Sequence, residues 1–344
     1  FEKPSELIDN IRLVVDRGLP VHAALAALTY TPAAMFDVAD QVGRIEPGQL
    51  ANIVLMSGPF EKKSSKVKFV FVEGEKFEKE TEGTEEEEGE EEETVGDEVV
   101  AVDEGPTWRC EIDSDRIPDR HTGGNVMIRN ATVITVSGQT LENASILIEE
   151  GRISAVGRAL AVPTGVMVID ATGRYVIPGM IDAHSHMGVD GNLNESSLAI
   201  TAEVQAGDLV RNDRVGFYRA LAGGVTTTHV MHGSANPIGG QNVVFKLKYK
   251  RPVEEMIVED APRTIKFALG ENVKQSNWPK RYGTRFPNGR MGVEAVIRDA
   301  FTAAQRYERG WIDHRVRAAA GEDVLVPRRD LRSDPGPERG QGRR

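Results

Sequence analysis

The sequence predicts an α/β protein in which a small β-sheet unit precedes the first part of an α/β barrel. Short apolar segments separated by glycines occupy residues 126–177, a pattern typical of strands joined by tight turns. After residue 177 the pattern changes to a strand, a helix and a further strand, and this succession favours parallel strands. A long amphipathic segment at 291–309 predicts another helix in that part.

The composition is that of a globular protein. Hydrophobic residues make up 40% of the 344 residues, which is enough for a packed core. The single cysteine, Cys110, excludes an internal disulfide and a cysteine-based zinc site. No apolar run reaches about 18 residues, so we expect no membrane span.

Most of the negative charge comes from one segment. The net charge is −11, and residues 81–100 hold ten Glu and one Asp without Lys or Arg, so the remainder is close to neutral. No basic face is evident, which argues against nucleic-acid binding. Because like charges repel and little apolar surface is available for burial, we expect residues 79–124 to form an acidic, disordered linker. An acidic binding tail or a weak calcium-binding tract is the alternative.

Residues 1–78 are expected to contain helices followed by strands. Apolar spacing places helices at 5–18 and 21–28, and Thr31 with Pro32 resembles an N-cap followed by proline at the first helical position. The strands expected in this segment are 53–56 and 67–72.

Residues 125–176 are expected to form the small β-sheet unit, with the clearest hairpin turn at 149–152. Its expected strands are 126–128, 132–136, 144–149, 152–156 and 166–170, followed by 175–177.

Residues 177–330 are expected to form the first part of the barrel, and residues 331–344 a disordered tail. The elements expected in the barrel part are a helix at 215–222, strands at 225–231 and 264–269, and the helix at 291–309.

The sharpest chemical signal is His184-Ser185-His186, which follows an apolar strand and a Pro-Gly bend. On a strand, residues i and i+2 point to the same face, so the two imidazoles would converge. Such a pair suits two nitrogen ligands of one divalent metal, at roughly 2.0–2.1 Å each for zinc. The motif alone is weak, because two exposed histidines in a turn are common.

The segment Gly173–His186 resembles the first-strand signature of the amidohydrolase superfamily. The strands at 125–170 resemble the N-terminal half of its β-sandwich, and Leu221–Thr228 resembles its second-strand segment. Gly233–Gln241 and Lys266–Lys274 resemble the imidazolonepropionase-like branch, with a deacetylase-like or dihydroorotase-like branch as the alternative. The resemblance implies a partial TIM-type (β/α)8 barrel of the metal-dependent hydrolase type with a small β-sandwich domain.

The first segment resembles the opposite end of the same superfamily. Ala26–Ala34 and Gly43–Leu55 are similar to the C-terminal helix and closing strands, with Asn52 where the family usually has Asp. The order is then back end, linker, front end, which suggests a fragment of a tandem protein. We expect residues 43–76 and 125–176 to pack together into one composite sandwich.

The resemblance implies a divalent metal, expected to be zinc, as one or two ions. Its implied ligands are His184, His186, a carboxylated lysine, two further histidines and an aspartate. Lys266 is the first candidate for the lysine and Lys274 the second, and an ordinary strand-end lysine is the alternative for Lys266. The remaining ligands and the catalytic aspartate are expected to lie outside the chain, so we expect an incomplete site.

Three further residues are candidates for substrate binding at the same barrel end: Asn236, Gln241 and His232. We expect the segment around Asn236 and Gln241 to be a polar, glycine-rich turn, for which a purely structural turn is the alternative. The resemblance places no ligands at His229 or His232, so both are expected to line the mouth or to satisfy local hydrogen bonds.

The resemblance implies a metal-dependent amidohydrolase that hydrolyses an amide or cyclic amide C–N bond of a small-molecule substrate with metal-activated water. An aspartate would take the proton from water and give it to the leaving nitrogen. The alternative is a catalytically inactive fragment that acts as a scaffold or partner-binding module. The expected partner is an oligomer or the remainder of a longer chain, and the localisation stays open.

Overall fold

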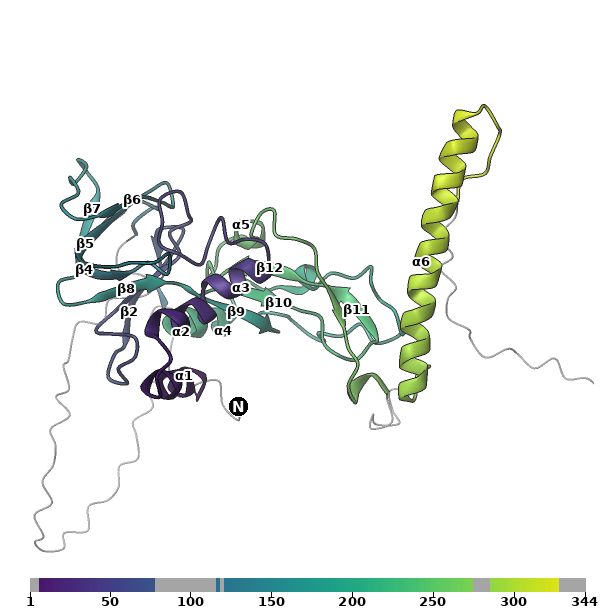
Figure 1. Ribbon diagram of the computed structural model, residues 1–344, viewed down its shortest axis with the longest axis horizontal. Helices are drawn as coiled ribbons and strands as arrows, with labels where there is room; N and C mark the ends of the chain where they lie inside the picture. Colours follow the sequence, from purple (N-terminus) through teal and green to yellow (C-terminus); the bar gives the residue numbers. More distant parts are fainter. Residues whose placement is uncertain (1–5, 78–115, 118–120, 275–284, 328–344) are drawn as a thin grey trace, which may run out of the picture. The chain divides into compact units, whose positions relative to one another are not determined.

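The computed structural model describes residues 6–77, 116–117, 121–274 and 285–327 (Figure 1). Most of the predicted linker and all of the predicted tail at 331–344 lie outside these residues. The described chain divides into two compact units, and the chain first passes from one to the other between Ile181 and Asp182, inside the strand that carries the His-x-His motif. The later segments Tyr218–Thr226 and Leu247–Tyr249 also belong to the first unit. The predicted domain boundaries stay predictions.

Three helices open the first unit: α1 (Glu6–Asp16), α2 (Val21–Leu28) and α3 (Tyr30–Met35). The predictions for α1 and α2 are confirmed. The predicted start of α3 is wrong, because Thr29, not Thr31, is the N-cap residue. Pro32 fits inside the first helical turn, where a backbone N–H has no intrahelical partner to lose.

Eight strands of the first unit form one hydrogen-bonded sheet, in the order β3-β2-β1-β8-β4-β5-β6, with β7 paired to β4. These strands are β1 (Ile53–Met56), β2 (Val67–Val72), β3 (Glu75–Lys76), β4 (Val126–Ile134), β5 (Thr140–Glu149), β6 (Arg152–Gly157), β7 (Met167–Asp170) and β8 (Tyr175–Pro178).

The pairing of β1 with β8 joins the two segments that the sequence places on either side of the linker. The strands are antiparallel, with Ile53 opposite Pro178 and Met56 opposite Tyr175. Next to this pair, the carbonyl of Asn52 accepts from Gly179 N at 2.8 Å, and its side-chain Oδ1 accepts from Glu73 N at 2.8 Å. Asn52 therefore stabilises the sheet by accepting these two hydrogen bonds. The sandwich form of the composite domain remains a proposal.

Strand β4 differs from the prediction of two separate strands at 126–128 and 132–136. It runs continuously, with register irregularities between Ile128 and Val133. Asn130 sits at this irregularity with φ of 61°, a conformation that Asn adopts more readily than most residues. The polar pair Arg129-Asn130 interrupts the apolar pattern at this irregularity, and for that reason the sequence favours a break.

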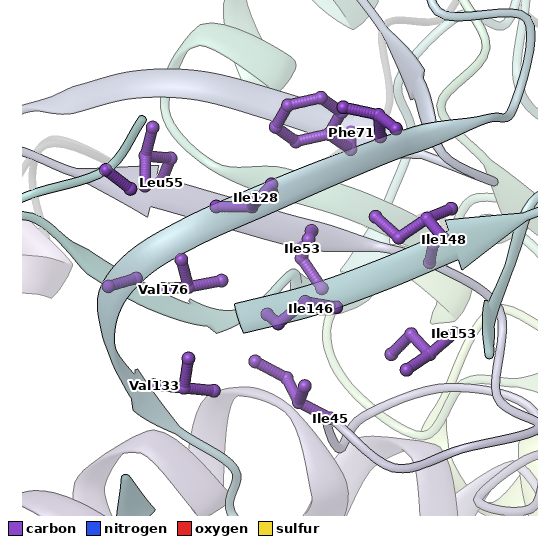
Figure 2. Packing of buried hydrophobic residues seen from close by; sticks show 14 of the residues in the cluster. Ile45, Ile53, Leu55, Phe71, Ile128, Val133, Ile146, Ile148, Ile153 and Val176 are labelled. Atoms are coloured by element: carbon purple, nitrogen blue, oxygen red, sulfur yellow. The ribbon is translucent and has the colours of Figure 1, made fainter. Parts of the chain in front are cut away.

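The sheet is stabilised by a cluster of branched aliphatic side chains (Figure 2). Ile and Val dominate the cluster because β-branched side chains pack well on a pleated surface. Each fully buried side chain of this size contributes roughly 1.5–3 kcal/mol. The labelled members, all at most 1% exposed, are Ile45, Ile53, Leu55, Phe71, Ile128, Val133, Ile146, Ile148, Ile153 and Val176.

A strand–helix–strand succession follows the sheet and confirms one predicted repeat: β9 (Met180–Ser185), α4 (Val215–Ala222) and β10 (Val225–Val230). Strand β9 neighbours β10 in a three-stranded sheet completed by β12 (Val243–Lys246). A short 3₁₀ helix, η2 (Ala206–Leu209), lies in the connection between β9 and α4.

After β10 the predicted alternation of helices and parallel strands is wrong. Strand β12 runs antiparallel to β10, and β11 (Ile238–Gln241) runs antiparallel to β13 (Ile265–Phe267) in a separate two-stranded sheet. Only the four-residue helix α5 (Val253–Met256) and no longer helix separates β12 from β13. The fold is therefore α/β with mixed sheets.

The last elements are η3 (Asn272–Lys274) and α6 (Arg290–Ala319), which is longer than the predicted 291–309. Within α6, Val293 and Val296 are buried, and Phe301 stacks on Phe267 of β13 with ring centroids 6.0 Å apart. Of the helices in the described part of the chain, none is long and apolar enough to span a membrane.

Candidate functional site

The His-x-His motif lies at the end of β9, as its position after the Pro-Gly bend predicts. Ser185 is buried, whereas His184 and His186 on either side of it are exposed. The two imidazole centroids are 5.4 Å apart, with ring planes at 88°. The two rings are therefore close enough for their nitrogens to approach a common point.

One ring of the pair has a defined orientation. The Nδ1 atom of His186 lies 2.9 Å from the carbonyl oxygen of Met231, which follows β10. Because a carbonyl only accepts, Nδ1 carries a proton, and in the neutral ring Nε2 is the atom with the lone pair. Met231 in turn donates its N–H to the carbonyl of Ser185 at 2.9 Å. This backbone support is of the kind that orients metal-ligating histidines.

Lys266 approaches the motif from β13. Its Nζ lies 3.5 Å from Nε2 of His184, although the two residues are 82 positions apart in the sequence. Burial lowers the pKa of Lys266. Desolvation lowers the pKa of His184, with smaller contributions from the charge of Lys266 and from His186. Both effects favour neutral nitrogens, which are the forms that bind metals.

The donor set fits part of a divalent-metal site. Neutral imidazoles suit zinc and similar ions, and a neutral amine or its carbamate could add a third donor. Among the described residues, no group of three or more His, Cys, Asp or Glu side chains is arranged to hold a metal. His184, His186 and Lys266 therefore make at most a partial site within this part of the chain.

Lys274, the second candidate for the lysine, is engaged elsewhere. Its ammonium group forms an ion pair with Glu271, which also accepts from Arg290 at 2.8 Å. The structure brings Lys266, rather than Lys274, to the histidine pair.

His232 is buried, at 4% exposure, and both of its ring nitrogens are bonded to the backbone. Nε2 accepts from Glu195 N at 3.0 Å, so Nδ1 must carry the proton that it donates to the Gly233 carbonyl at 3.0 Å. Burial lowers the pKa of this ring. The arrangement matches local hydrogen bonding and leaves no nitrogen for direct substrate contact.

Asn236 is fully buried and anchors the loop at 195–201. Its Nδ2 donates to the carbonyls of Glu195 at 2.7 Å and Leu198 at 2.8 Å, while its Oδ1 has no hydrogen-bond partner among the described residues. This burial argues against the predicted substrate contact.

Gln241 is half-buried at the end of β11, and its Nε2 donates to the Ala202 carbonyl at 2.9 Å. It lines a hollow of about 590 Å³ together with Asp208, Asn242 and Arg263. Of the three predicted substrate-binding residues, Gln241 is the one that faces open space.

The predicted glycine-rich turn at 239–240 is instead part of β11. An added Cβ at Gly239 would lie 2.7 Å from Nδ1 of His232, and one at Gly240 would lie 2.8 Å from the Val204 carbonyl. The glycines are required because β11 packs directly against His232 and the chain at Val204. A Gly-Gly pair favours a turn in the sequence, and nothing local indicates this close packing.

Two polar residues near the site were not singled out from the sequence: Thr264 and Asn242. Nε2 of His229 lies 2.8 Å from the hydroxyl of Thr264, which also accepts from Asn242 Nδ2 at 3.1 Å. His229 is 4% exposed, and burial lowers its pKa. A polar residue just before a strand is a weak signal, so only the tertiary contact identifies these two side chains.

Comparison with known proteins gives one consistent family. The amidohydrolase family model matches residues 3–77. The amidohydrolase tasK of Hapsidospora irregularis is 30% identical over 250 residues, which cover 61% of this chain and 25% of that protein. A dihydroorotase of Pelobacter propionicus is 33% identical over 107 residues, covering 31% of this chain and 22% of that protein. A D-hydantoinase of Geobacillus stearothermophilus is 44% identical over 61 residues, covering 18% and 12%.

A solved structure shows the same likeness. The amidohydrolase from Thermotoga maritima MSB8 matches with a TM-score of 0.50 and 34% identity over 58% of this chain and 52% of that one. Together with the family match, this implies a TIM-barrel-type fold. The chain spans about a quarter of the length, or less, of the three curated relatives and about half of the solved structure.

Proposed function

Because this chain is a member of the amidohydrolase superfamily, we propose that it provides part of a metal centre for hydrolysis of a C–N bond in an amide or cyclic amide. Its relatives include proteins named amidohydrolase, dihydroorotase and hydantoinase. Membership generally implies a divalent metal, and zinc is the ion that we propose. The imidazolonepropionase-like branch and the composite sandwich belong to the same proposal.

One observation carries the proposal: His184, His186 and Lys266 converge from two different sheets. The exposed rings lie 5.4 Å apart, and Lys266 Nζ stands 3.5 Å from His184 Nε2. An ordinary strand-end lysine would extend into water and retain its charge, whereas burial lowers the pKa of Lys266. When bound, a divalent metal supplies Lewis acidity that activates water towards a carbonyl at neutral pH.

The residues of this chain would prepare the site in two ways. The Met231 carbonyl fixes the His186 tautomer, so that Nε2 is the ligand atom. A lowered pKa raises the fraction of neutral Lys266 amine, which can add to carbon dioxide. That step forms an N–C bond and releases a proton, giving an anionic carbamate whose oxygens suit divalent cations. The remaining ligands and the proton-transferring carboxylate would come from outside the described residues.

The alternative, a catalytically inactive partner-binding module, is supported by the incomplete donor set.

Metal content separates the two functions. We expect zinc to co-purify with the wild-type chain in a stoichiometric ratio when measured by mass spectrometry. The double variant His184→Ala/His186→Ala should lose it. His121→Ala is the matched control, because His121 is an exposed histidine whose side chain pairs with Glu75 instead.

A wild-type chain without metal, or a double variant that keeps its zinc, would contradict the proposed metal centre. Zinc lost from the double variant alone would support it. If His121→Ala loses zinc as well, the metal is bound nonspecifically through surface histidines, and the proposal fails.

A further inference from the structure

A chain of hydrogen bonds links the strand of the histidine pair to the strand of Lys266. The Nδ1 atom of His229, on β10, lies 3.3 Å from the carbonyl of Ala183, which is adjacent to His184 on β9. On the other side of the same ring, Nε2 lies 2.8 Å from the hydroxyl of Thr264. Thr264 is two residues before Lys266. The His229 ring therefore spans the gap between the two strands.

For a neutral His229 ring, the carbonyl at one end sets the direction of every bond in this chain. The Ala183 carbonyl can only accept, so Nδ1 of His229 carries the proton and Nε2 of the neutral ring is an acceptor. Thr264 must then donate its hydroxyl proton to Nε2, and its oxygen accepts from Asn242 Nδ2 at 3.1 Å. The result is one ordered relay of four residues: Asn242, Thr264, His229 and Ala183.

The relay connects two strands that lie in separate sheets, one with Lys266 and the other with His184. Strand β13 pairs with β11, whereas β9 lies in the sheet with β10 and β12. No described strand pairing ties β13 directly to β9. The backbone adds one more tie, in which Asn242 N donates to the Thr264 carbonyl at 2.9 Å. The relay is thus placed to set the distance between the lysine and the histidine pair.

We propose that His229 and Thr264 are positioning residues that hold Lys266 against His184. This inference rests on the proposed function, because it assigns these residues a role in assembling that metal centre. His229 is not itself available as a ligand, since both ring nitrogens are used in the relay. The relay acts through Lys266 and His184, which would touch the ion.

The relay also predicts which hydroxyl matters. Thr264 shares its hydroxyl with two partners. The hydroxyl of Thr228, buried on β10 next to His229, has no hydrogen-bond partner in the part of the chain that the structure describes. Thr264→Val and Thr228→Val remove the same hydroxyl from two threonines of this region, of which Thr264 is half-buried and Thr228 is buried. Thr264→Ser keeps the hydroxyl and tests whether that group, rather than the methyl, is required.

The test measures zinc affinity of the full chain by competition with a chromophoric chelator, using zinc ions alone. We expect Thr264→Val to weaken zinc binding about tenfold, at the lower end of the effect of outer-shell partners. Thr264→Ser and Thr228→Val should stay within about twofold of wild type. Circular dichroism confirms that each variant is folded before its affinity is compared.

A second readout needs no variant and no metal. Nitrogen-15 NMR of the His229 ring in the wild-type chain should show the neutral tautomer with the proton on Nδ1. The opposite tautomer, or a charged ring at pH 7.5, would contradict the relay even if Thr264→Val failed to fold.

The outcomes separate the two proposals. A wild-type chain that binds no zinc contradicts the proposed function and with it this inference. Zinc binding that is equal in wild type and folded Thr264→Val overturns the positioning role alone. Equal losses in Thr264→Val and Thr228→Val also overturn it, because they would show a general sensitivity of the core.

Discussion

The eight-stranded sheet and the strand ends around His184 contrast in how side chains are held. In the sheet, Ile53, Ile128 and Val176 are fully buried and held by apolar contact. At the strand ends, His186 hydrogen-bonds to a carbonyl oxygen, and His229 hydrogen-bonds to a carbonyl oxygen through one ring nitrogen and to a hydroxyl through the other. Apolar burial is nondirectional, whereas each polar contact fixes one atom. Substitutions in the first region should therefore change the free energy of unfolding without changing metal binding, whereas those at the strand ends should change metal binding or cause smaller losses of stability.

The largest effect on stability is expected from the sheet. Phe71→Ala removes a fully buried ring on β2 and should lower the free energy of unfolding by about 3–5 kcal/mol. Denaturant titration measures the loss, and zinc per folded chain should not change. Val168→Ala on β7, where the side chain is 44% exposed, is the control and should cost far less. Equal losses in the two variants would contradict the proposed core.

A smaller loss is expected where β11 packs on His232. Gly239→Ala places a Cβ 2.7 Å from the His232 ring, so the ring or the strand must shift, at a cost of about 1–3 kcal/mol. The control is Gly270→Ala, because no atom of the described residues lies within 4 Å of its added Cβ. Thermal melting compares the two. A Gly239→Ala variant as stable as wild type would show that β11 does not pack against the ring.

Acid should lower the free energy of unfolding through two buried histidines near the strand ends, His229 and His232. Burial lowers the pKa of His229 and His232 below the ordinary value of 6.5. Below about pH 6.5 the unfolded chain then binds more protons than the folded chain, so the free energy of unfolding falls as pH falls. Above that pH the contribution is fully present. NMR titration of the two rings checks the sign, and a midpoint above 6.5 for either ring would contradict it.

The smallest effect is expected at Thr228. Its buried hydroxyl has no hydrogen-bond partner among the residues that the structure describes, so Thr228→Val removes an unsatisfied polar group without breaking a described bond. We expect a change in the free energy of unfolding within about 0.5 kcal/mol, or a slight gain. Chemical denaturation measures it. A loss above about 1 kcal/mol would reveal a partner for this hydroxyl and remove its value as a control.

The sequence predicts elements well where one periodic pattern covers the whole element. Residues 21–28, 53–56, 67–72 and 215–222 have the predicted bounds, because apolar spacing of period 3.6 or an apolar run defines each of them. Strands β11 and β12 were missed. The Gly-Gly pair in β11 is typical of a turn, and its strand conformation depends on contacts with Val204 and His232.

The candidate site, like the strands, can be predicted where a local pattern defines it and not where it depends on residues distant in the sequence. The two-residue spacing of His184 and His186 is enough to place both rings on one side of β9. The approach of Lys266 to His184 follows from the superfamily resemblance, not from spacing. The burial of Asn236 could not be predicted, because its partners Glu195 and Leu198 lie 41 and 38 residues away. Site assignments from the sequence are therefore firmest for residues on a single strand.

The central claim is that His184, His186 and Lys266 form a metal-binding half-site. The most direct measurement is a zinc-edge anomalous difference map from crystals of the full chain grown with zinc ions. We expect a peak ligated by Nε2 of both histidines, with Lys266 or its carbamate beside it. A zinc ion bound only elsewhere, with this pair left without metal, would contradict the account.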